Sequence, residues 1–231
     1  IAAFCEASGA DVREVARAIG TDSRIGPKFL NAGPGFGGSC FQKDILNLVY
    51  LCRHFGLPEV ADYWESVVAL NTWQQHRIAR LVVQKLFGTV TGKRLAIFGF
   101  AFKADTNDTR EAPAIRICRD LLEEGAQLVI HDPKVEVRQM ARDLQQDAAP
   151  QADALSGTGT WSQAASAEDA VTGADAVLVL TEWKHYRDLN WQALAARMRK
   201  PAWVFDARAV ADPAQIKAAG LSLWRVGDGE S

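Results

Sequence analysis

The chain has 231 residues, 48% of them hydrophobic and 23% charged, which is enough for one large core or two smaller ones. Its 26 basic and 28 acidic residues nearly balance, which excludes a global positive field that would recruit nucleic acid or an anionic membrane. The sequence shows no apolar run of membrane-spanning length and no signal peptide. We therefore expect a globular, two-domain protein located in the cytoplasm.

The first 87 residues are predicted to be helical. An amphipathic pattern from Ile1 to Ser8 stops at Gly9, and a second helix follows Asp11, a good N-cap, and ends at Gly20. The chain starts inside the first pattern and without a Met. We expect it to be a fragment of a longer protein.

The most informative segment is the glycine-rich stretch 33–38, which leads to Cys40 and then into a helical pattern that ends near Phe55. The glycines let the backbone turn and let a ligand approach main-chain N–H groups. Cys40 is expected at the start of the helix, where the helix dipole and Lys43 favour a thiolate, the nucleophilic form. Asp44 follows one turn later on the same face, where it can orient water or accept a proton. The pattern predicts a nucleophile with a base beside it.

A structural interpretation of this segment stays open, because cysteine is often a small buried apolar residue and glycines often mark only a loop. The other cysteines, Cys5, Cys52 and Cys118, lie in apolar helical patterns without a CxxC pair or a Cys/His cluster. We expect these three to be packing residues, and we predict neither a disulfide framework nor a metal site.

Pro58 begins the longest predicted helix, which carries apolar residues at helical spacing to Leu86 and stops at Gly88. A helix of about 28 residues spans about 42 Å, more than a compact domain requires. It is predicted to bridge two domains and to provide a subunit interface, although it could simply cross one large core. We expect an all-α central domain at residues 1–87, with this long linking helix, and a second domain at 88–231.

After residue 92 the pattern changes to short apolar runs separated by helical stretches. The runs lie at residues 95–99, 127–130, 176–180 and 202–205, and the helical stretches near 113–124, 135–144, 164–170, 191–198 and 213–219. Fully apolar strands that alternate with helices predict a Rossmann-like α/β domain with a parallel sheet. The segment 147–160, rich in Ala, Gly, Ser and Asp, is predicted to be a loop or a disordered insertion.

A dinucleotide site is not predicted in this second domain, although Gly99 follows the first strand and Asp132 ends the second. The residues after Phe98 lack the GxGxxG spacing that seats a pyrophosphate. The sequence His131-Asp132-Pro133 fits better with a turn that ends a strand.

Cations and aromatic residues at the carboxyl edge of the predicted sheet suit a nucleotide or a phosphosugar instead. The loop 100–110 offers Lys103 and Arg110, and Arg208 follows the fourth apolar run. Each of these cations could also be a solvated surface charge.

Several sequence blocks together resemble one known family. They are CEASGADV at 5–12, SRIGPKFL at 23–30, the glycine-rich loop with Cys40, FGFAFK at 98–103, DTNDTRE at 105–111, TEW at 181–183 and FDAR at 205–208. In these blocks the chain resembles the UDP-glucose 6-dehydrogenases of the UDP-glucose/GDP-mannose dehydrogenase superfamily, over essentially its whole length.

The resemblance implies an enzyme that uses NAD to oxidise the C6 alcohol of UDP-glucose to the carboxylate of UDP-glucuronate, for polysaccharide biosynthesis. Cys40 would carry a thiohemiacetal and then a thioester, with help from Asp44 in water and proton transfer. Lys43 and Arg110 would lie on the NAD side, and Arg24 would reach the substrate of a neighbouring subunit in a homodimer or larger oligomer. The residues implied to bind UDP-glucose are Phe29, Leu30, Asn31, Gly33, Phe36, Gly37, Phe102, Lys103 and Arg208.

The sequence departs from the family in lacking the GxGxxG domain that binds NAD and the catalytic Lys and Asn of a preceding helix. We therefore expect the chain alone to be inactive, and NADH formation by it would contradict this. Related enzymes oxidise GDP-mannose or N-acetylated UDP-sugars, but the N-acetyl branch usually has His before its Cys, where this chain has Ser39. A non-catalytic nucleotide-sugar-binding or oligomerisation module is the alternative from a different class.

Overall fold

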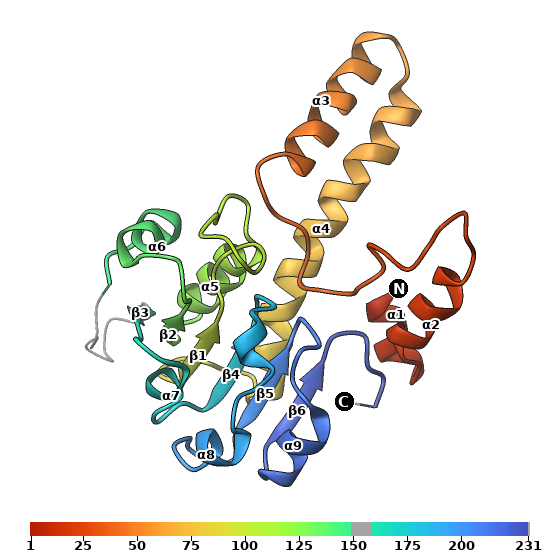
Figure 1. Cartoon of the computed structure of the whole chain (residues 1–231). Coiled ribbons are helices and arrows are strands. Elements are labelled where there is room, and N and C mark those ends of the chain that lie inside the picture. Colours follow the sequence, from red (N-terminus) through yellow and green to blue (C-terminus); the bar gives the residue numbers. More distant parts are fainter. Residues whose placement is uncertain (149–158, 231) are drawn as a thin grey trace.

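A helical hairpin stands away from a six-stranded α/β domain, and two short helices lie beside the same domain (Figure 1). This is a computed structural model, which describes residues 1–148 and 159–230. Within these ranges, none of the helices combines the length and hydropathy that crossing a membrane requires. The predicted fold class, a helical region followed by a Rossmann-like domain, is confirmed.

The first two helices have the ends that their capping residues predict. α1 (Ala2–Ser8) stops at Gly9, whose φ of 78° is the left-handed conformation that commonly terminates helices. α2 (Val12–Gly20) begins after Asp11, whose side chain accepts a hydrogen bond from the backbone N–H of Arg13.

The hairpin consists of α3 (Phe41–His54) and α4 (Pro58–Lys85), and α4 connects two hydrophobic cores. The smaller core lies between the two helices and is formed by Ile45, Val49, Cys52 and Ala61. From Ile78 onward, the same helix packs in the main core of the α/β domain. The predicted 28-residue helix is therefore present, and it bridges the two cores.

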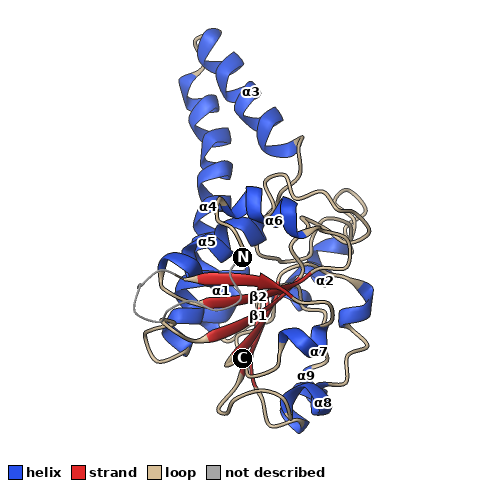
Figure 2. Cartoon of the chain, turned by 90° about the vertical axis from the view of Figure 1, so that its left-hand side faces the viewer, coloured by secondary structure: helices blue, strands red, loops and turns tan. Residues whose placement is uncertain are grey.

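The sheet has the strand order β3-β2-β1-β4-β5-β6, and every neighbouring pair is parallel. Its strands are β1 (Arg94–Phe98), β2 (Gln127–His131), β3 (Thr160–Gln163), β4 (Ala176–Val179), β5 (Trp203–Asp206) and β6 (Ser222–Arg225). Between them lie α5 (Pro113–Glu123), α6 (Val137–Leu144), α7 (Ala167–Ala170), the 3-10 helix η1 (Lys184–Tyr186), α8 (Trp191–Ala195) and α9 (Pro213–Ala218). Helices lie on both sides of the sheet (Figure 2).

The four predicted apolar runs are the four inner strands, β2, β1, β4 and β5. The two edge strands, β3 and β6, were not predicted. An edge strand has one neighbour, so part of it faces solvent and keeps polar residues, as in β3 with Thr160, Ser162 and Gln163. The predicted loop 147–160 is corrected at Thr160, which begins β3. Most of that predicted loop lies outside the described residues.

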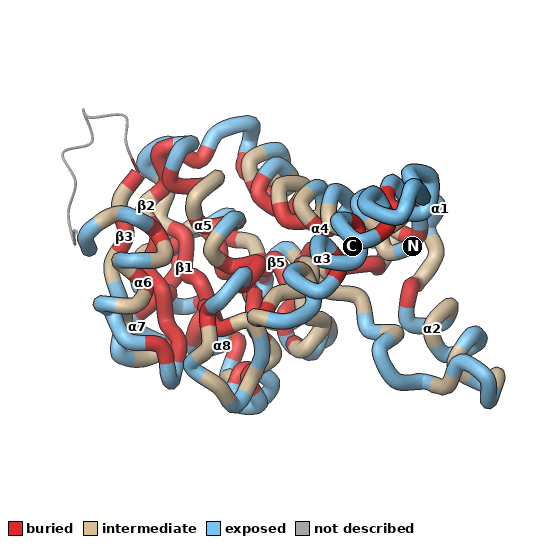
Figure 3. The backbone as a smooth tube through the Cα atoms, turned by 90° about the horizontal axis from the view of Figure 1, so that it is seen from above, coloured by how far each residue is buried: buried red, intermediate tan, exposed pale blue. Residues whose placement is uncertain are grey.

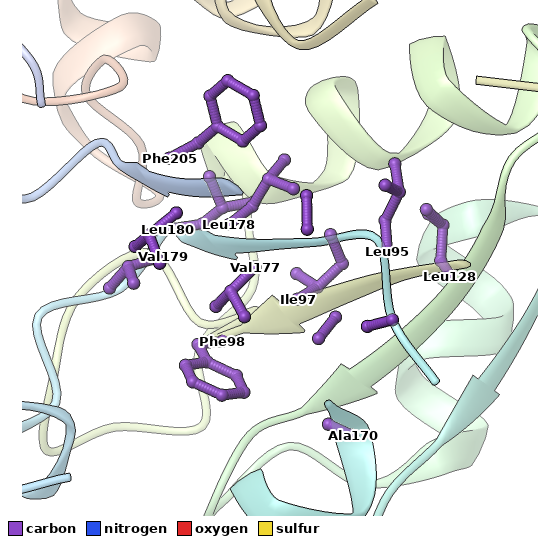
Figure 4. Close-up of a cluster of buried hydrophobic side chains, with 14 of the residues drawn as sticks. Leu95, Ile97, Phe98, Leu128, Ala170, Val177, Leu178, Val179, Leu180 and Phe205 are labelled. Atoms are coloured by element: carbon purple, nitrogen blue, oxygen red, sulfur yellow. The ribbon is translucent and has the colours of Figure 1, made fainter. Parts of the chain in front are cut away.

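The main core fills the space between the sheet and its helices. Val177 and Leu178 of β4 point to opposite faces, which is the alternation expected of a strand covered on both sides (Figure 4). Buried residues concentrate on the strands, whereas the hairpin and α2 are largely exposed (Figure 3). Cys5, Cys52 and Cys118 are buried as expected, and burial raises the pKa of the Cys118 thiol.

The N-terminal helices pack against the turn that follows β6. The backbone N–H of Val12 donates to Gly227, and that of Gly229 donates to Ala10. A Cβ atom at Gly227 would lie 2.1 Å from Cγ1 of Val12, so only glycine permits this approach.

Glu6 of α1 ties this contact to the hairpin. Its carboxylate accepts hydrogen bonds from the backbone N–H of Gly227 at 2.8 Å and from Nε1 of Trp224 at 3.2 Å, and it forms an ion pair with Arg77 of α4. The side chains of Glu6 and Arg77 are only 11% and 16% exposed.

Replacing Glu6 with Gln is expected to lower the free energy of unfolding by about 2 kcal/mol, because Arg77 would lose its charged partner in a poorly solvated position. Urea unfolding followed by tryptophan fluorescence measures this change. Glu14→Gln is the matched control, since the Glu14 side chain is 72% exposed. Equal urea midpoints for the two variants would contradict the expectation.

Candidate active site

The glycine-rich loop crosses the carboxyl edge of the sheet, where open α/β folds bind their ligands. A Cβ atom at Gly37 would lie 2.3 Å from the carbonyl oxygen of Glu111, so the two backbones are in direct contact. The N–H of Gly38 donates to the carbonyl of Arg110 at 2.7 Å. The glycines therefore let the loop pack directly on the segment between β1 and α5.

Phe102 and Lys103 meet the same loop from the β1 side. A Cβ atom at Gly38, whose φ is 88°, would lie 3.1 Å from the ring of Phe102. Nζ of Lys103 lies 5.4 Å from the centroid of that ring. An aromatic face and a cation thus border the glycines.

The opposite side of the loop is held by α4. Oδ1 of Asn71 accepts from the N–H of Phe36 at 2.8 Å, and Nδ2 of Asn71 donates to the carbonyl of Phe36 at 3.1 Å. Nε2 of Gln74 donates to the carbonyl of Gly33 at 3.0 Å. The loop is therefore fastened on both sides.

Cys40 is the N-cap of α3 and the exposed member of the four cysteines. Its Sγ lies 3.5 Å from Oγ of Ser39. The N–H of Asp44 donates to the carbonyl of Cys40 at 2.8 Å, so the carboxylate follows one turn later, as predicted. The Asp44 side chain is 68% exposed and lies 3.9 Å from Nζ of Lys43.

A cavity of about 430 Å³ lies beside Cys40, and it brings Lys43 and Arg110 together. It is lined by Gly38, Ser39, Gln42, Lys43, Leu46, Arg110 and Glu111. Arg110 pairs with Asp108 at 2.7 Å, which lowers the pKa of the Asp108 carboxyl and raises the pKa of Arg110. The backbone carbonyl of Arg110 accepts from the N–H of Gly38, two residues before Cys40, so the chain brings Arg110 to the same part of the loop as the thiol.

Arg208 links the loops that follow β1, β4 and β5. Its guanidinium donates to the carbonyls of Leu180 at 2.9 Å and Phe102 at 3.0 Å, and its Nε lies 3.1 Å from the carboxylate of Glu182. Burial lowers the pKa of Arg208, and the Glu182 carboxylate opposes this shift. Nη1 of Arg208 lies 3.5 Å from where a Cβ atom of Gly33 would stand.

A larger cavity, of about 550 Å³, lies between α2, the loop 27–32 and the segments after β4 and β5. Apolar side chains such as Leu30 and Pro27 share its lining with Asn31 and with Arg13, Arg17, Arg187 and Arg208. Apolar walls with several guanidinium groups suit a nucleoside that carries phosphates.

Of the predicted substrate residues, three line the larger cavity: Leu30, Asn31 and Arg208. The other seven line neither cavity: Arg24, Phe29, Gly33, Phe36, Gly37, Phe102 and Lys103. Arg24 and Phe29 are also far out on an exposed loop. Arg24 pairs with Asp22, and its side chain is 87% exposed. Phe29 is fully exposed and has a φ of 63°. Both belong to the loop after α2, which projects from the body of the chain (Figure 1, red).

Asp132 occupies the backbone N–H groups that a pyrophosphate would need at the β1 turn. Its Oδ2 accepts from the N–H of Phe100 at 2.7 Å and of Ala101 at 3.0 Å, and from Nε1 of Trp183 at 3.2 Å. Its Oδ1 accepts from the N–H groups of Lys134 and Val135. The strand-ending interpretation of Asp132 is confirmed, because these last two bonds close the turn after β2.

Thr181 closes the remaining space at the same turn, because a Cβ atom at Gly99 would lie 2.3 Å from its Cβ. The strand order is that of dinucleotide-binding domains, and its switch point falls between β1 and β4. Side chains of the protein fill this switch point. Within the described ranges, no group of three His, Cys, Asp or Glu residues could hold a metal ion.

Sequence reasoning missed Asn71, Gln74, Glu182 and Arg187. A signal for the first existed, because Asn71 and Gln75 interrupt the apolar stripe of α4 at helical spacing and are 6% and 8% exposed. Buried amides in an apolar stripe require partners, which here belong to the glycine-rich loop in the case of Asn71. Glu182 follows β4 and Arg187 follows η1, and neither lies in a pattern that assigns it a role.

Comparison with known proteins identifies both halves of the chain. Residues 1–73 match the central domain of the UDP-glucose/GDP-mannose dehydrogenase family, and residues 96–213 match the UDP binding domain of that family.

Individual relatives agree with these matches. The chain is 49% identical over 234 residues to UDP-glucose 6-dehydrogenase 2 of Oryza sativa subsp. japonica, covering 98% of this chain and 48% of that protein. It is 48% identical over 229 residues to UDP-glucose 6-dehydrogenase of Gallus gallus, covering 98% of this chain and 46% of that protein. The chain thus spans about half the length of the curated relatives it matches.

A solved structure shares the fold. The UDP-glucose dehydrogenase of the archaeon Pyrobaculum islandicum superposes with a TM-score of 0.73 at 27% identity, covering 97% of this chain and 45% of that one.

Proposed function

Because the chain belongs to the UDP-glucose/GDP-mannose dehydrogenase family, we propose that it forms part of an NAD-dependent UDP-glucose 6-dehydrogenase. The proposed reaction oxidises the C6 hydroxyl of UDP-glucose to the carboxylate of UDP-glucuronate. The observation that supports it best is Cys40, an exposed thiol at a helix start, where the glycine-rich loop meets the cations of the sheet edge.

Cys40 is the proposed nucleophile. Its Sγ adds to C6 of the aldehyde that the first two-electron oxidation forms, and the product is a thiohemiacetal. The second oxidation turns this into a thioester, which water attacks at the carbonyl carbon while the thiolate leaves. Asp44, one turn along α3, orients that water and accepts its proton.

The nucleotide part of the substrate is proposed to bind on the opposite side of the glycine-rich loop. Arg208 places positive charge in the larger cavity and Leu30 offers apolar surface there, while Lys103 adds positive charge beside the ring of Phe102. Gly33 lies against Arg208 and Gly37 against Glu111, and together with Phe36 they are proposed to shape the loop around the substrate. Arg24 stays a predicted contact of a substrate on a neighbouring subunit, and Phe29 stays a predicted contact of UDP-glucose.

NAD would supply the oxidising equivalents, with two NAD+ molecules per turnover each accepting one hydride. Lys43 and Arg110 fit a role in holding it, because both line the cavity beside Cys40 and carry positive charge toward phosphate or ribose groups. The β1 turn does not fit a pyrophosphate, because Asp132 already accepts from its N–H groups.

A homodimer or larger homo-oligomer in the cytoplasm is part of the proposal. Its basis is the hairpin, where large apolar side chains are exposed. They include Phe41, Tyr50, Phe55, Tyr63 and Leu70.

Alkylation of the four cysteines by iodoacetamide, followed by mass spectrometry, tests the proposed function. We expect Cys40 to react about tenfold faster than the buried Cys52 and Cys118. Saturating UDP-glucose should slow the reaction of Cys40 about fivefold or more, because the sugar would cover the thiol. Cys40→Ser identifies the labelled peptide.

Two outcomes would count against the proposal. If UDP-glucose leaves the alkylation rate of Cys40 unchanged, the substrate does not bind over the thiol. Equal protection by GDP-mannose would indicate a different nucleotide sugar.

A further inference from the structure

The amide of Asn71 is buried at the middle of α4, between the two hydrophobic cores that this helix connects. A buried amide costs free energy unless its donor and acceptor are both used. Asn71 uses both on one residue, because Phe36 donates to Oδ1 at 2.8 Å and accepts from Nδ2 at 3.1 Å.

The residue before Phe36 is shaped to receive this side chain. Gly35 has a φ of 128°, and a Cβ atom there would lie 2.7 Å from Oδ1 of Asn71. Gln74, one turn further along α4, donates to the carbonyl of Gly33. The loop therefore meets α4 in one register, because a shift by one residue would put a side chain where Gly35 lies.

Phe36 also connects this contact to the helix that begins at Cys40. Its ring stacks edge-on against Phe41 with the centroids 4.6 Å apart, and it packs on the small core of the hairpin. Two residues after Phe36, Gly38 is fixed to the carbonyl of Arg110 on the sheet side. The path from α4 to Cys40 is thus short and held at both ends.

We propose that Asn71 is a positioning residue, which sets where Cys40 stands relative to Arg110 and the cavity beside it by holding the backbone of Phe36. Asn71 itself touches neither the cavity beside Cys40 nor the larger cavity. The proposal rests on the proposed role of Cys40 as the nucleophile.

The test compares Asn71→Leu, which keeps the branching of the side chain and removes both hydrogen bonds, with Asn47→Leu at an exposed position of α3. UDP-glucose affinity is measured by calorimetry, and alkylation of each cysteine is measured with and without UDP-glucose. In the wild-type chain Cys52 and Cys118 report on the two cores, because both are buried.

For Asn71→Leu we expect protection of Cys40 by UDP-glucose to fall from about fivefold to less than about twofold, while the affinity stays within about threefold. Without ligand, Cys40 should react about threefold more slowly, because the loop that places it near Arg110 is no longer held on the α4 side. Cys52 and Cys118 should react as in the wild type. Asn47→Leu should change none of these rates.

Three outcomes separate the possibilities. Wild-type protection and wild-type Cys40 reactivity in Asn71→Leu would overturn the proposal. Faster alkylation of Cys52 than in the wild type would also overturn it, because Asn71 would then support the hairpin as a whole. If UDP-glucose fails to protect wild-type Cys40, the proposed function fails, and the ligand-free rate of Asn71→Leu still decides whether Asn71 positions the thiol.

Discussion

Replacing Gly37 with Ala is expected to weaken UDP-glucose binding about a hundredfold, or about 3 kcal/mol. The new Cβ atom would lie 2.3 Å from the carbonyl oxygen of Glu111, 2.9 Å from its carbonyl carbon and 3.1 Å from Cα of Ala112. All three are backbone atoms, so no side-chain rotation relieves the contact. The loop must then move away from the sheet edge, and the surface between Phe102 and Arg208 is lost.

Calorimetric titration with UDP-glucose measures this effect. Gly56→Ala, in the turn between α3 and α4, is the matched control, because the added methyl group meets nothing within 4 Å. Its left-handed φ of 72° is expected to cost about 1 kcal/mol of stability without changing the affinity. A Gly37→Ala chain that binds as tightly as Gly56→Ala would show that contact with Glu111 is unimportant for the ligand.

Replacing Asp132 with Ala is expected to destabilise the α/β domain by about 4 kcal/mol. The substitution leaves five donors without their acceptor, among them the N–H groups of Phe100 and Ala101, which are 0% and 1% exposed. Each buried, unpaired donor costs about 1–3 kcal/mol, and water that enters the space left by the carboxylate offsets part of the sum.

Urea unfolding monitored by circular dichroism gives the change in free energy. Asp132→Asn should lower the free energy of unfolding by about half as much. Its amide oxygen still accepts from two N–H groups, while its NH2 group faces the other donors. Asp188→Ala, at an exposed position after η1, provides the control. If Asp132→Ala unfolds at the same urea concentration as Asp188→Ala, the carboxylate is not what holds the β1 turn.

Local chemistry explains what the sequence predicted well. The helix ends at Gly9 and Asp11 follow from the conformation of one residue and one hydrogen bond, so neighbouring residues suffice to foresee them. The same holds for Cys40 at the start of α3 and for the inner strands, which are apolar because both of their faces are covered.

Contacts between distant segments were beyond that reasoning. No local pattern predicts the contact between Gly37 and Glu111 or the hydrogen bond between Phe36 and Asn71. These pairs form only when α4 and the sheet have packed. The edge strand β6 was missed because half of it faces solvent. The predicted role of Arg24, which is exposed here, depends on a second subunit, so a single chain does not bring this residue to a site.

The long helix α4 makes three sets of contacts. It packs in the hairpin and in the main core, and between these it is hydrogen-bonded to the loop that leads to Cys40. A rigid rod of 28 residues transmits a tilt at one end to the other. A mutation near Ala61, far from the cations of the sheet edge, should therefore disturb the thiol as well as the fold. Substitutions that stabilise the hairpin without changing the reactivity of Cys40 would therefore have to preserve the orientation of the α4 axis.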